Sequence, residues 1–121
     1  MSEKETGGAR PTIDPATLKQ WIREGRKFRV VDIRSPEQHA AGHIPGAENE
    51  FINAALKQGD AQAVDRIDAA DGVPIVTVCN QGGSCRIASD LLRKKGVEAY
   101  ALEGGMKAWL SDENPVEKEQ G

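Results

Sequence analysis

The sequence predicts an α/β domain built on a mostly parallel sheet. Short apolar runs that are typical of buried strands alternate with amphipathic segments that are typical of helices, and this order favours parallel strands joined by helices. The clearest run, IVTV at residues 75–78, stops at Cys79, where a glycine-containing loop and a helical pattern follow. In open α/β sheets, ligands bind beyond the carboxyl ends of the strands. The cysteine therefore marks the place where we expect the functional site.

The chain begins with a predicted arm and a helix. Residues 1–10 are polar and contain glycine, and we expect them to form a flexible amino-terminal arm. Asp14 and Pro15 mark a helix start, because aspartate can accept hydrogen bonds from free helical N–H groups and proline suits the first turn. Apolar residues recur at helical spacing up to Gly25, where we expect the helix to end.

A strand and a short helix follow. The run RVVDI at residues 29–33 is typical of a buried strand. The sequence Ser-Pro-Glu at 35–37 repeats the helix-start signal and opens a helix that we expect to end at Gly42. Residues 43–47 are rich in turn-forming residues, which predicts a connector there.

The rest of the chain continues the alternation of helices and strands. The expected elements are, in order, a helix over 51–57, a helix over 61–69, a strand over 75–78, a helix over 85–95, a strand over 98–102 and a helix over 106–110. Four apolar residues of the helix over 85–95 are expected to face the core: Ile87, Ala88, Leu91 and Leu92. The segment 112–121 is acidic, and we expect a flexible tail.

Composition excludes several classes of function. The 121 residues are enough for one domain, and their net charge of −3 argues against a nucleic-acid partner, which requires a basic face. No apolar run approaches the ~18 residues of a membrane span, and the first residues lack the apolar core of a signal peptide. We therefore expect a cytoplasmic protein without a membrane partner, in which the two cysteines are free or reactive. Two histidines and two cysteines at dissimilar spacings also make a closed zinc site improbable.

A buried cysteine often only fills a core, so Cys79 has an ordinary interpretation beside a catalytic one. Its position favours catalysis, because the loop after it holds two glycines and three hydrogen-bonding side chains. Such a loop can direct its N–H groups to the sulfur, and the following helix adds the positive end of its dipole. Both effects stabilise the thiolate, which is the nucleophilic form. We predict that Cys79 is a reactive thiol.

Three motifs occur in order along the chain: VVDIRSPEQHAAGHIPGA at 30–47, VCNQGGSC at 78–85 and LEGGMKAW at 102–109. They resemble the amino-terminal signature, the active-site loop and the carboxyl-terminal signature of the single-domain rhodaneses, a family of sulfurtransferases. The resemblance covers residues 11–111 and implies one domain whose five-stranded parallel sheet is flanked by helices on both faces. It also implies that Cys79 is the nucleophile and that the reaction needs neither a metal nor an organic cofactor.

Loop length separates the chemistries that the resemblance allows. The family's sulfurtransferases have six residues from the cysteine to the end of the loop, here Cys79 to Ser84. Related phosphatases and arsenate reductases have a loop one residue longer that ends in arginine, which clamps a tetrahedral anion. In this chain Arg86 lies seven positions after Cys79, already in the predicted helix. A phosphatase or arsenate reductase is therefore the less favoured alternative.

The loop that we expect to bind the anionic substrate carries no charge. Its residues are Asn80, Gln81, Gly82, Gly83, Ser84 and Cys85. Family members that are specialised for thiosulfate have basic residues in this loop. Thiosulfate therefore stays a candidate donor, and low-molecular-weight persulfides or polysulfides are equally reasonable.

Cys85 has two interpretations that the sequence leaves open. It is either a resolving thiol that forms a disulfide with Cys79 or a small residue where the family usually has serine. A bridge requires Cα atoms within ~7 Å, and six positions across an ordered loop argue against that distance. Trp21 and Trp109 are most simply aromatic residues of the core.

The remaining polar residues near the motifs are expected to support the site. Asp32 and Arg34 follow the strand at 29–33, and we expect them to pair beside the loop, with Arg86 as a further supporting residue. The resemblance places His43 in a structural turn, and we expect His39 on a solvated helix face. Neither histidine is needed as a base, because sulfur transfer to a thiolate moves no proton at the nucleophile.

The expected reaction is a double displacement through a Cys79 persulfide. The partners would be a small-molecule sulfur donor and a thiol or cyanide acceptor, with a protein sulfur acceptor also compatible. The competing hypothesis is a persulfide carrier or protein-docking module that does not turn over without a fixed partner.

Overall fold

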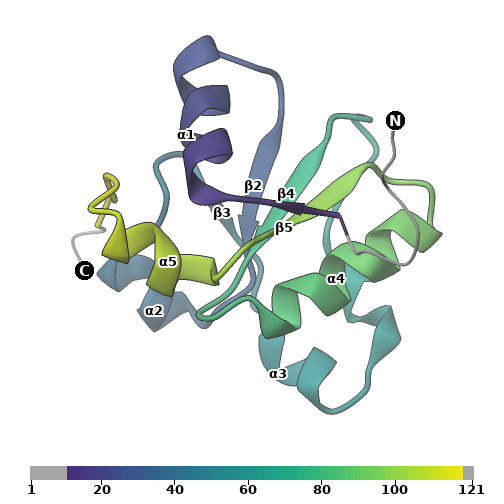
Figure 1. Ribbon diagram of the computed structural model, residues 1–121. Coiled ribbons are helices and arrows are strands. Elements are labelled where there is room, and N and C mark those ends of the chain that lie inside the picture. The colour runs from purple at the N-terminus through teal and green to yellow at the C-terminus, as the bar shows by residue number, and fades with distance from the viewer. Residues whose placement is uncertain (1–10, 119–121) are drawn as a thin grey trace.

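The computed structural model describes residues 11–118 (Figure 1). The predicted arm at 1–10 and the last three residues of the predicted tail lie outside the described residues. Five strands form one sheet in which every neighbouring pair is parallel, in the order β1-β5-β4-β2-β3. The strands are β1 (Thr12–Ile13), β2 (Arg29–Asp32), β3 (Glu48–Asn49), β4 (Ile75–Val78) and β5 (Ala99–Leu102). The prediction of a five-stranded parallel α/β fold is confirmed.

Helices cover both faces of this sheet (Figure 1). They are α1 (Pro15–Glu24), α2 (Pro36–Ala41), α3 (Asn53–Lys57), the 3₁₀ helix η2 (Ala61–Arg66), α4 (Gly83–Lys94) and α5 (Gly105–Ser111). Residues of α3, η2 and α4 pack on one face of the sheet, and residues of α1 and α5 pack on the other. The first helix starts as expected, because the Asp14 carboxylate accepts a hydrogen bond from the Thr17 N–H at 2.8 Å.

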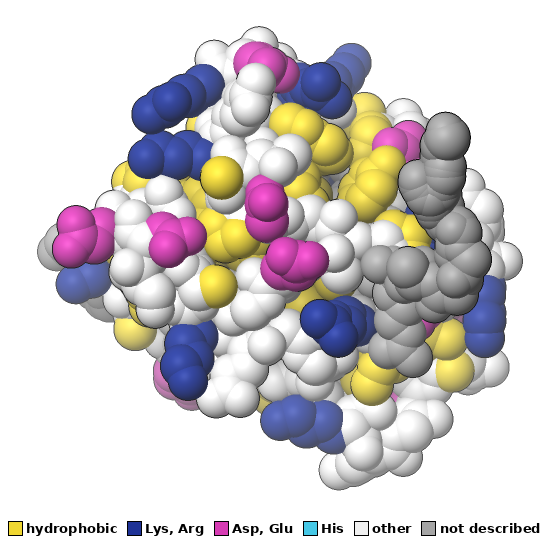
Figure 2. All heavy atoms as spheres, viewed as in Figure 1, with side chains coloured by type: hydrophobic (Ala, Val, Ile, Leu, Met, Phe, Trp, Pro, Cys, Tyr) yellow, Lys and Arg dark blue, Asp and Glu magenta, His cyan; other side chains and the backbone are white. Residues whose placement is uncertain are grey.

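Strand periodicity divides the apolar side chains between two cores. Val31 and Ile75 face the core under α3 and α4, whereas Val30 and Val76 face the core under α1 and α5. Successive side chains of a strand point to opposite faces, so a central strand needs apolar residues on both. Trp109 is fully buried in the second core. Figure 2 shows hydrophobic side chains gathered at the surface beside α1.

Two predicted helices and one predicted core residue differ from the structure. The helix expected over 61–69 is the shorter 3₁₀ helix η2, and α4 begins at Gly83, two residues earlier than expected. Gly82 makes that early start feasible, because its φ of 98° lies in the left-handed region that glycine adopts without strain. Ile87 is 41% exposed instead of facing the core. The buried stripe of α4 runs through Cys85, Ala88, Ser89 and Leu92, and Ile87 lies outside it.

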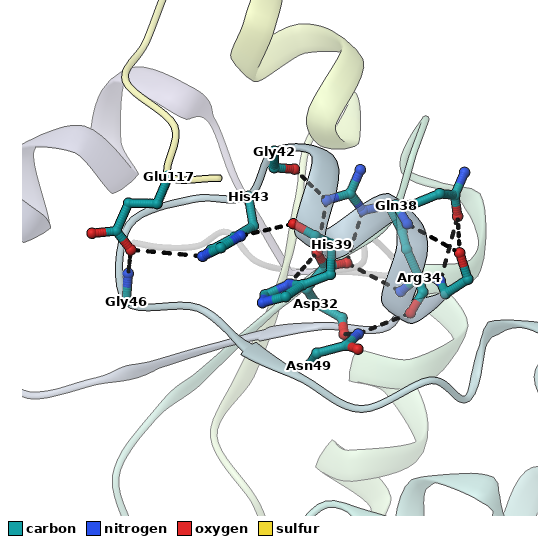
Figure 3. A network of polar contacts seen from close by, with 10 residues as sticks. Asp32, Arg34, Gln38, His39, Gly42, His43, Gly46, Asn49 and Glu117 are labelled. Carbon is teal, nitrogen blue, oxygen red and sulfur yellow. Dashed lines mark hydrogen bonds and ion pairs between the residues drawn. The ribbon is translucent and has the colours of Figure 1, made fainter. Parts of the chain in front are cut away.

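The described part of the predicted tail also differs from the expectation. The Trp109 indole N–H donates to the Pro115 carbonyl at 2.8 Å. His43 and Glu117 exchange two backbone hydrogen bonds of 2.9 and 2.8 Å and form an isolated antiparallel bridge. The Glu117 carboxylate also accepts a hydrogen bond from the Gly46 N–H at 3.1 Å and lies 3.6 Å from His43 Nε2 (Figure 3). The segment is thus held by backbone and side-chain contacts with residues that are distant in the sequence.

The start of α5 packs directly on the chain that leaves β4. The N–H groups of Met106 and Lys107 donate to the carbonyls of Cys79 and Asn80 at 2.8 and 2.9 Å. Gly105 makes this approach feasible, because a Cβ atom there would lie 2.4 Å from the Cys79 carbonyl oxygen. The glycine pair of the third motif therefore fixes the backbone around the cysteine.

Gly105→Ala should lower the free energy of unfolding by about 2 kcal/mol or more, because it adds a steric clash to a residue held at a φ of 58°. Gly83→Ala is the matched control, since no described atom lies within 4 Å of the added Cβ and the residue has no positive φ. Urea unfolding of both variants measures the difference. Equal loss of stability in the two variants would contradict the close packing at Gly105.

Candidate active site

Cys79 lies directly after β4, at the carboxyl edge of the sheet. Its side chain is part of the core under α3 and α4 and is 4% exposed. The exposed part borders a surface hollow of about 380 Å³, which is also lined by the loop after β4 and by α3. The thiol is therefore held by the core and open to a small molecule on one side.

Backbone N–H groups converge on the Cys79 sulfur. The Gly82 N–H donates to Sγ at 3.0 Å, and the N–H groups of Gln81 and Cys85 also point to it. The Cys85 thiol adds a side-chain hydrogen bond, and this bond is the largest cause that lowers the pKa of Cys79 to about 6, against the opposing effect of burial. Donors directed at the sulfur stabilise the thiolate relative to the thiol.

The negative charge of the cysteine pair belongs on Cys79. Cys85 is fully buried, and its sulfur lies 3.8 Å from the Leu102 carbonyl, an acceptor that favours a protonated thiol. The hydrogen bond to Cys79, followed by burial and the charge of Cys79, raises the pKa of Cys85. Cys79 instead receives several N–H donors at the amino terminus of α4.

The loop that was predicted to bind the anion consists of a short turn followed by the first residues of α4. Asn80 and Gln81 form the turn, Gly82 caps α4, and Gly83, Ser84 and Cys85 are its first three residues. Because α4 begins at Gly83 and not at Cys85 as expected, its first turn follows Cys79 more closely along the chain. Of these residues, Asn80, Gln81, Gly83 and Ser84 line the hollow.

Asp32 and Arg34 form the buried pair that was expected, at the end of β2 (Figure 3). The Arg34 guanidinium donates from Nε and Nη2 to the two Asp32 oxygens at 2.9 and 2.7 Å, and Nη2 also donates to the Gly42 carbonyl at 2.7 Å. The Asn49 amide donates to the carbonyls of Asp32 and Arg34 at 3.0 and 2.9 Å. The network lies outside the lining of the hollow and shapes the chain beside β4, where the Ile33 N–H donates to the Val78 carbonyl at 2.9 Å.

The expectation of a solvated His39 is wrong. The side chain is 5% exposed, and its Nδ1 lies 2.9 Å from the Asp32 carboxylate (Figure 3). Helix α2 is only six residues long, and His39 is its one buried residue, turned toward the Asp32 carboxylate, whereas Glu37 and Gln38 are exposed. His43 stacks on His39 with ring centroids 3.8 Å apart, and its Nδ1 contacts the His39 carbonyl at 2.8 Å. Both histidines hold the connector after α2.

Arg86 does not take the supporting position that we expected. It is exposed on α4 and does not line the hollow. Its place on the helix explains the difference, because its neighbour Cys85 lies in the buried stripe and Arg86 points away from it.

Sequence reasoning missed Asn53 and Lys57, the α3 residues that line the hollow opposite the loop. They are four positions apart, so they share one helix face. Lys57 is the one cationic side chain among the described residues that line the hollow. The spacing was visible in the sequence, but nothing there indicated that α3 would lie against Cys79. The loop is neutral as expected, yet the hollow contains a cation.

A metal-binding cluster and a membrane-spanning helix are both absent from the described residues. Residues 11–118 contain no group of three or more His, Cys, Asp or Glu side chains arranged to hold a metal ion. Within the same range, no helix combines the length and apolar character that crossing a membrane requires. The chemistry available at the hollow is that of a thiolate, backbone N–H groups, amides, a hydroxyl and one ammonium group.

Comparisons with known proteins identify the family to which the chain belongs. Residues 14–112 match the family model of the rhodanese-like domain. The chain is 36% identical over 101 residues to the thiosulfate sulfurtransferase GlpE of Pseudomonas paraeruginosa, a match that covers 82% of this chain and 83% of the relative.

Two solved structures illustrate the range of the fold. A thiosulfate sulfurtransferase from Pseudomonas aeruginosa is 30% identical with a TM-score of 0.70, covering 92% of this chain and 20% of that one. A yeast protein tyrosine phosphatase of the rhodanese family, 23% identical with a TM-score of 0.65 and 84% of each chain covered, shares the fold. On the family match and the similarity to GlpE, the chain belongs to the rhodanese-like domain family.

Proposed function

We propose that the protein is a sulfurtransferase that carries sulfane sulfur as a persulfide on Cys79. The observation that carries the proposal is the convergence of N–H donors on the Cys79 sulfur, at the wall of a hollow open to small molecules. The similarity to a thiosulfate sulfurtransferase supports the same reaction class.

The reaction consists of two displacements at sulfur. The Cys79 thiolate attacks the sulfane sulfur of the donor, the sulfur–sulfur bond of the donor breaks, and the remainder leaves with the electron pair. For thiosulfate the leaving group is sulfite. An acceptor thiolate or cyanide then attacks the outer sulfur of the persulfide, and Cys79 leaves as the thiolate. The N–H groups that stabilise the thiolate also face the persulfide.

The lining of the hollow favours sulfur transfer over phosphate-ester hydrolysis. Sulfite and thiolates are stable anions that leave without a proton, whereas an alkoxide leaving group requires a general acid. No carboxylic acid or imidazole is found among the described residues that line the hollow. This absence of an acid adds to the loop-length argument against a phosphatase.

Lys57 favours an anionic sulfur donor. It is exposed at the wall of the hollow that also holds Cys79, so its ammonium group can bind the sulfonate end of a donor such as thiosulfate. It can also stabilise the sulfite that departs after the attack. The neutral loop supplies backbone dipoles, and α3 supplies the cation that the loop lacks.

Replacing the proposed nucleophile should abolish transfer. Cys79→Ser should lower thiosulfate-to-cyanide transfer by at least about a thousandfold, because a serine hydroxyl without a general base is a weak nucleophile. Steady-state thiocyanate formation measures this change, and thermal unfolding tests that the fold is retained. Substantial residual transfer by the folded variant would place the nucleophile elsewhere. A wild-type protein that loads one sulfur and then stalls with every small acceptor would instead be a carrier.

The thiolate can be titrated directly. Since the pKa of Cys79 is lowered to about 6, iodoacetamide should alkylate it at a constant rate above that pH and about tenfold more slowly per pH unit below it. Mass spectrometry of the peptide containing Cys79 gives the rate at each pH. Cys85→Ala removes a hydrogen bond to the sulfur and should move the midpoint upward. A wild-type midpoint at the free value of ~8.5 would contradict the donor geometry.

Lys57→Gln should lower kcat/KM for thiosulfate by several-fold, because a charge-assisted hydrogen bond is worth ~1.5–3 kcal/mol and exposure reduces that value. An alkanethiosulfonate carries one negative charge instead of two and should lose less. Lys94→Gln is the matched control, since Lys94 is the last residue of α4, whereas Cys79 lies beside the first turn of that helix. Equal losses for both donors at fixed ionic strength would show that Lys57 does not recognise donor charge.

A further inference from the structure

Cys85 is a second thiol that the transfer reaction does not use. It is the third residue of α4, it is fully buried, and it belongs to the same apolar cluster as Cys79. The Gly82 N–H, at the cap of the helix that carries Cys85, donates to the Cys79 sulfur at 3.0 Å, so the first turn of α4 packs on that sulfur. The interaction between the two thiols is also the largest cause of the shift in the pKa of each, as expected for neighbouring side chains of one cluster.

The surroundings of Cys85 fix its orientation. The Thr77 hydroxyl donates to the Cys85 carbonyl at 2.8 Å, and this bond ties the first turn of α4 to β4. Cys79 lines the hollow, whereas Cys85 does not. Cys85 therefore lies on the protein side of the Cys79 sulfur, opposite the side from which a donor approaches. The sequence contains no third cysteine.

We propose that Cys85 gives the Cys79 persulfide a second fate, in which an internal disulfide forms and sulfide is released. The proposal rests on the persulfide of the proposed function. It adds an activity, the reduction of sulfane sulfur to sulfide, to the transfer of that sulfur to an acceptor.

The step balances without an external oxidant. The Cys85 sulfur attacks the Cys79 sulfur, the bond between Cys79 and the outer sulfur breaks, and the outer sulfur leaves with the electron pair. The Cys85 thiol releases its proton to water and the leaving sulfur takes up a proton from water in the hollow, so that hydrosulfide departs and the protons balance. The sulfane sulfur is reduced to sulfide, and the two cysteine thiols are oxidised to a disulfide. A cellular dithiol, or two monothiols, must then reduce the disulfide.

The arrangement suits this displacement. Attack at sulfur requires the entering and leaving atoms to lie on opposite sides of the sulfur attacked. Cys85 approaches Cys79 from the core, and the outer sulfur of a persulfide would point into the hollow. The hydrosulfide ion would leave past the loop N–H groups and Lys57, which favour an anion.

Intact-mass spectrometry and sulfide capture test the proposal together. The reduced full-length protein, freed of reductant, is mixed with thiosulfate without an acceptor and is quenched in acid over time. In the wild type, a species that has gained one sulfur atom should give way to one that is lighter than the starting protein by two hydrogens. Up to one sulfide per chain should appear at a rate independent of protein concentration, because the step is intramolecular.

Two substitutions of Cys85 provide the comparison. In Cys85→Ser and Cys85→Ala the species with one added sulfur should accumulate, and sulfide release should be slower by at least about tenfold, because the intramolecular thiol acts at a high effective concentration. Loading of sulfur itself shows that each variant is folded. If neither variant loads, the wild-type masses and a peptide map of the Cys79–Cys85 disulfide decide the question.

The two proposals fail in different ways. A wild-type persulfide that persists without sulfide or disulfide overturns the role of Cys85 and leaves the sulfurtransferase intact. Sulfide release by the two variants at the wild-type rate overturns it as well. A wild-type protein that gains no sulfur from any donor overturns the proposed function itself.

Discussion

The hydrogen bonds that converge on the Cys79 sulfur are the constraint on which the site depends. A backbone N–H can reach that sulfur only if the chain leaves β4, turns at once and enters α4 with its amino terminus toward the thiol. Gly82 provides the left-handed turn, and Gly105 allows α5 to bind the carbonyls of the same short segment. The carbonyls of the turn are thereby bound from behind, while its N–H groups face the sulfur, so a polar backbone is satisfied at the edge of an apolar core.

The buried network at the end of β2 fixes the chain beside the cysteine. A buried carboxylate requires partners, and Asp32 obtains them from Arg34 and His39. Removing one partner of a buried ion pair typically costs about 3–5 kcal/mol, so the network fixes the conformation of the chain after β2. It also connects to the carboxyl-terminal segment through the backbone pairing of His43 with Glu117. The rigidity of the strand edge beside Cys79 thus depends on residues that do not line the hollow.

Both backbone and side-chain groups contribute to the electrostatics of the site. The Cys79 thiolate is stabilised by backbone N–H dipoles that belong to the fold and by the thiol of Cys85. The proposed recognition of donor charge belongs to Lys57 on α3, which lines the same hollow. Cys85 is buried beside Cys79 and does not line the hollow. A substitution of Lys57 can therefore change the charge of the hollow without removing a group that stabilises the thiolate, whereas a substitution of Cys85 changes the thiolate as well.

The sequence by itself determined the parallel α/β fold, the helix starts at Asp14 and Ser35 and the place of Cys79, because these follow from local patterns of apolar residues, caps and glycines. It did not reveal the two-residue strands β1 and β3, which are too short to show a period. Only the tertiary structure decided that His39 is buried, that Lys57 lines the hollow and that Cys85 touches Cys79. Each of these depends on which distant segments meet, and that is set by the packing of whole helices on the sheet and not by the residues adjacent in the chain.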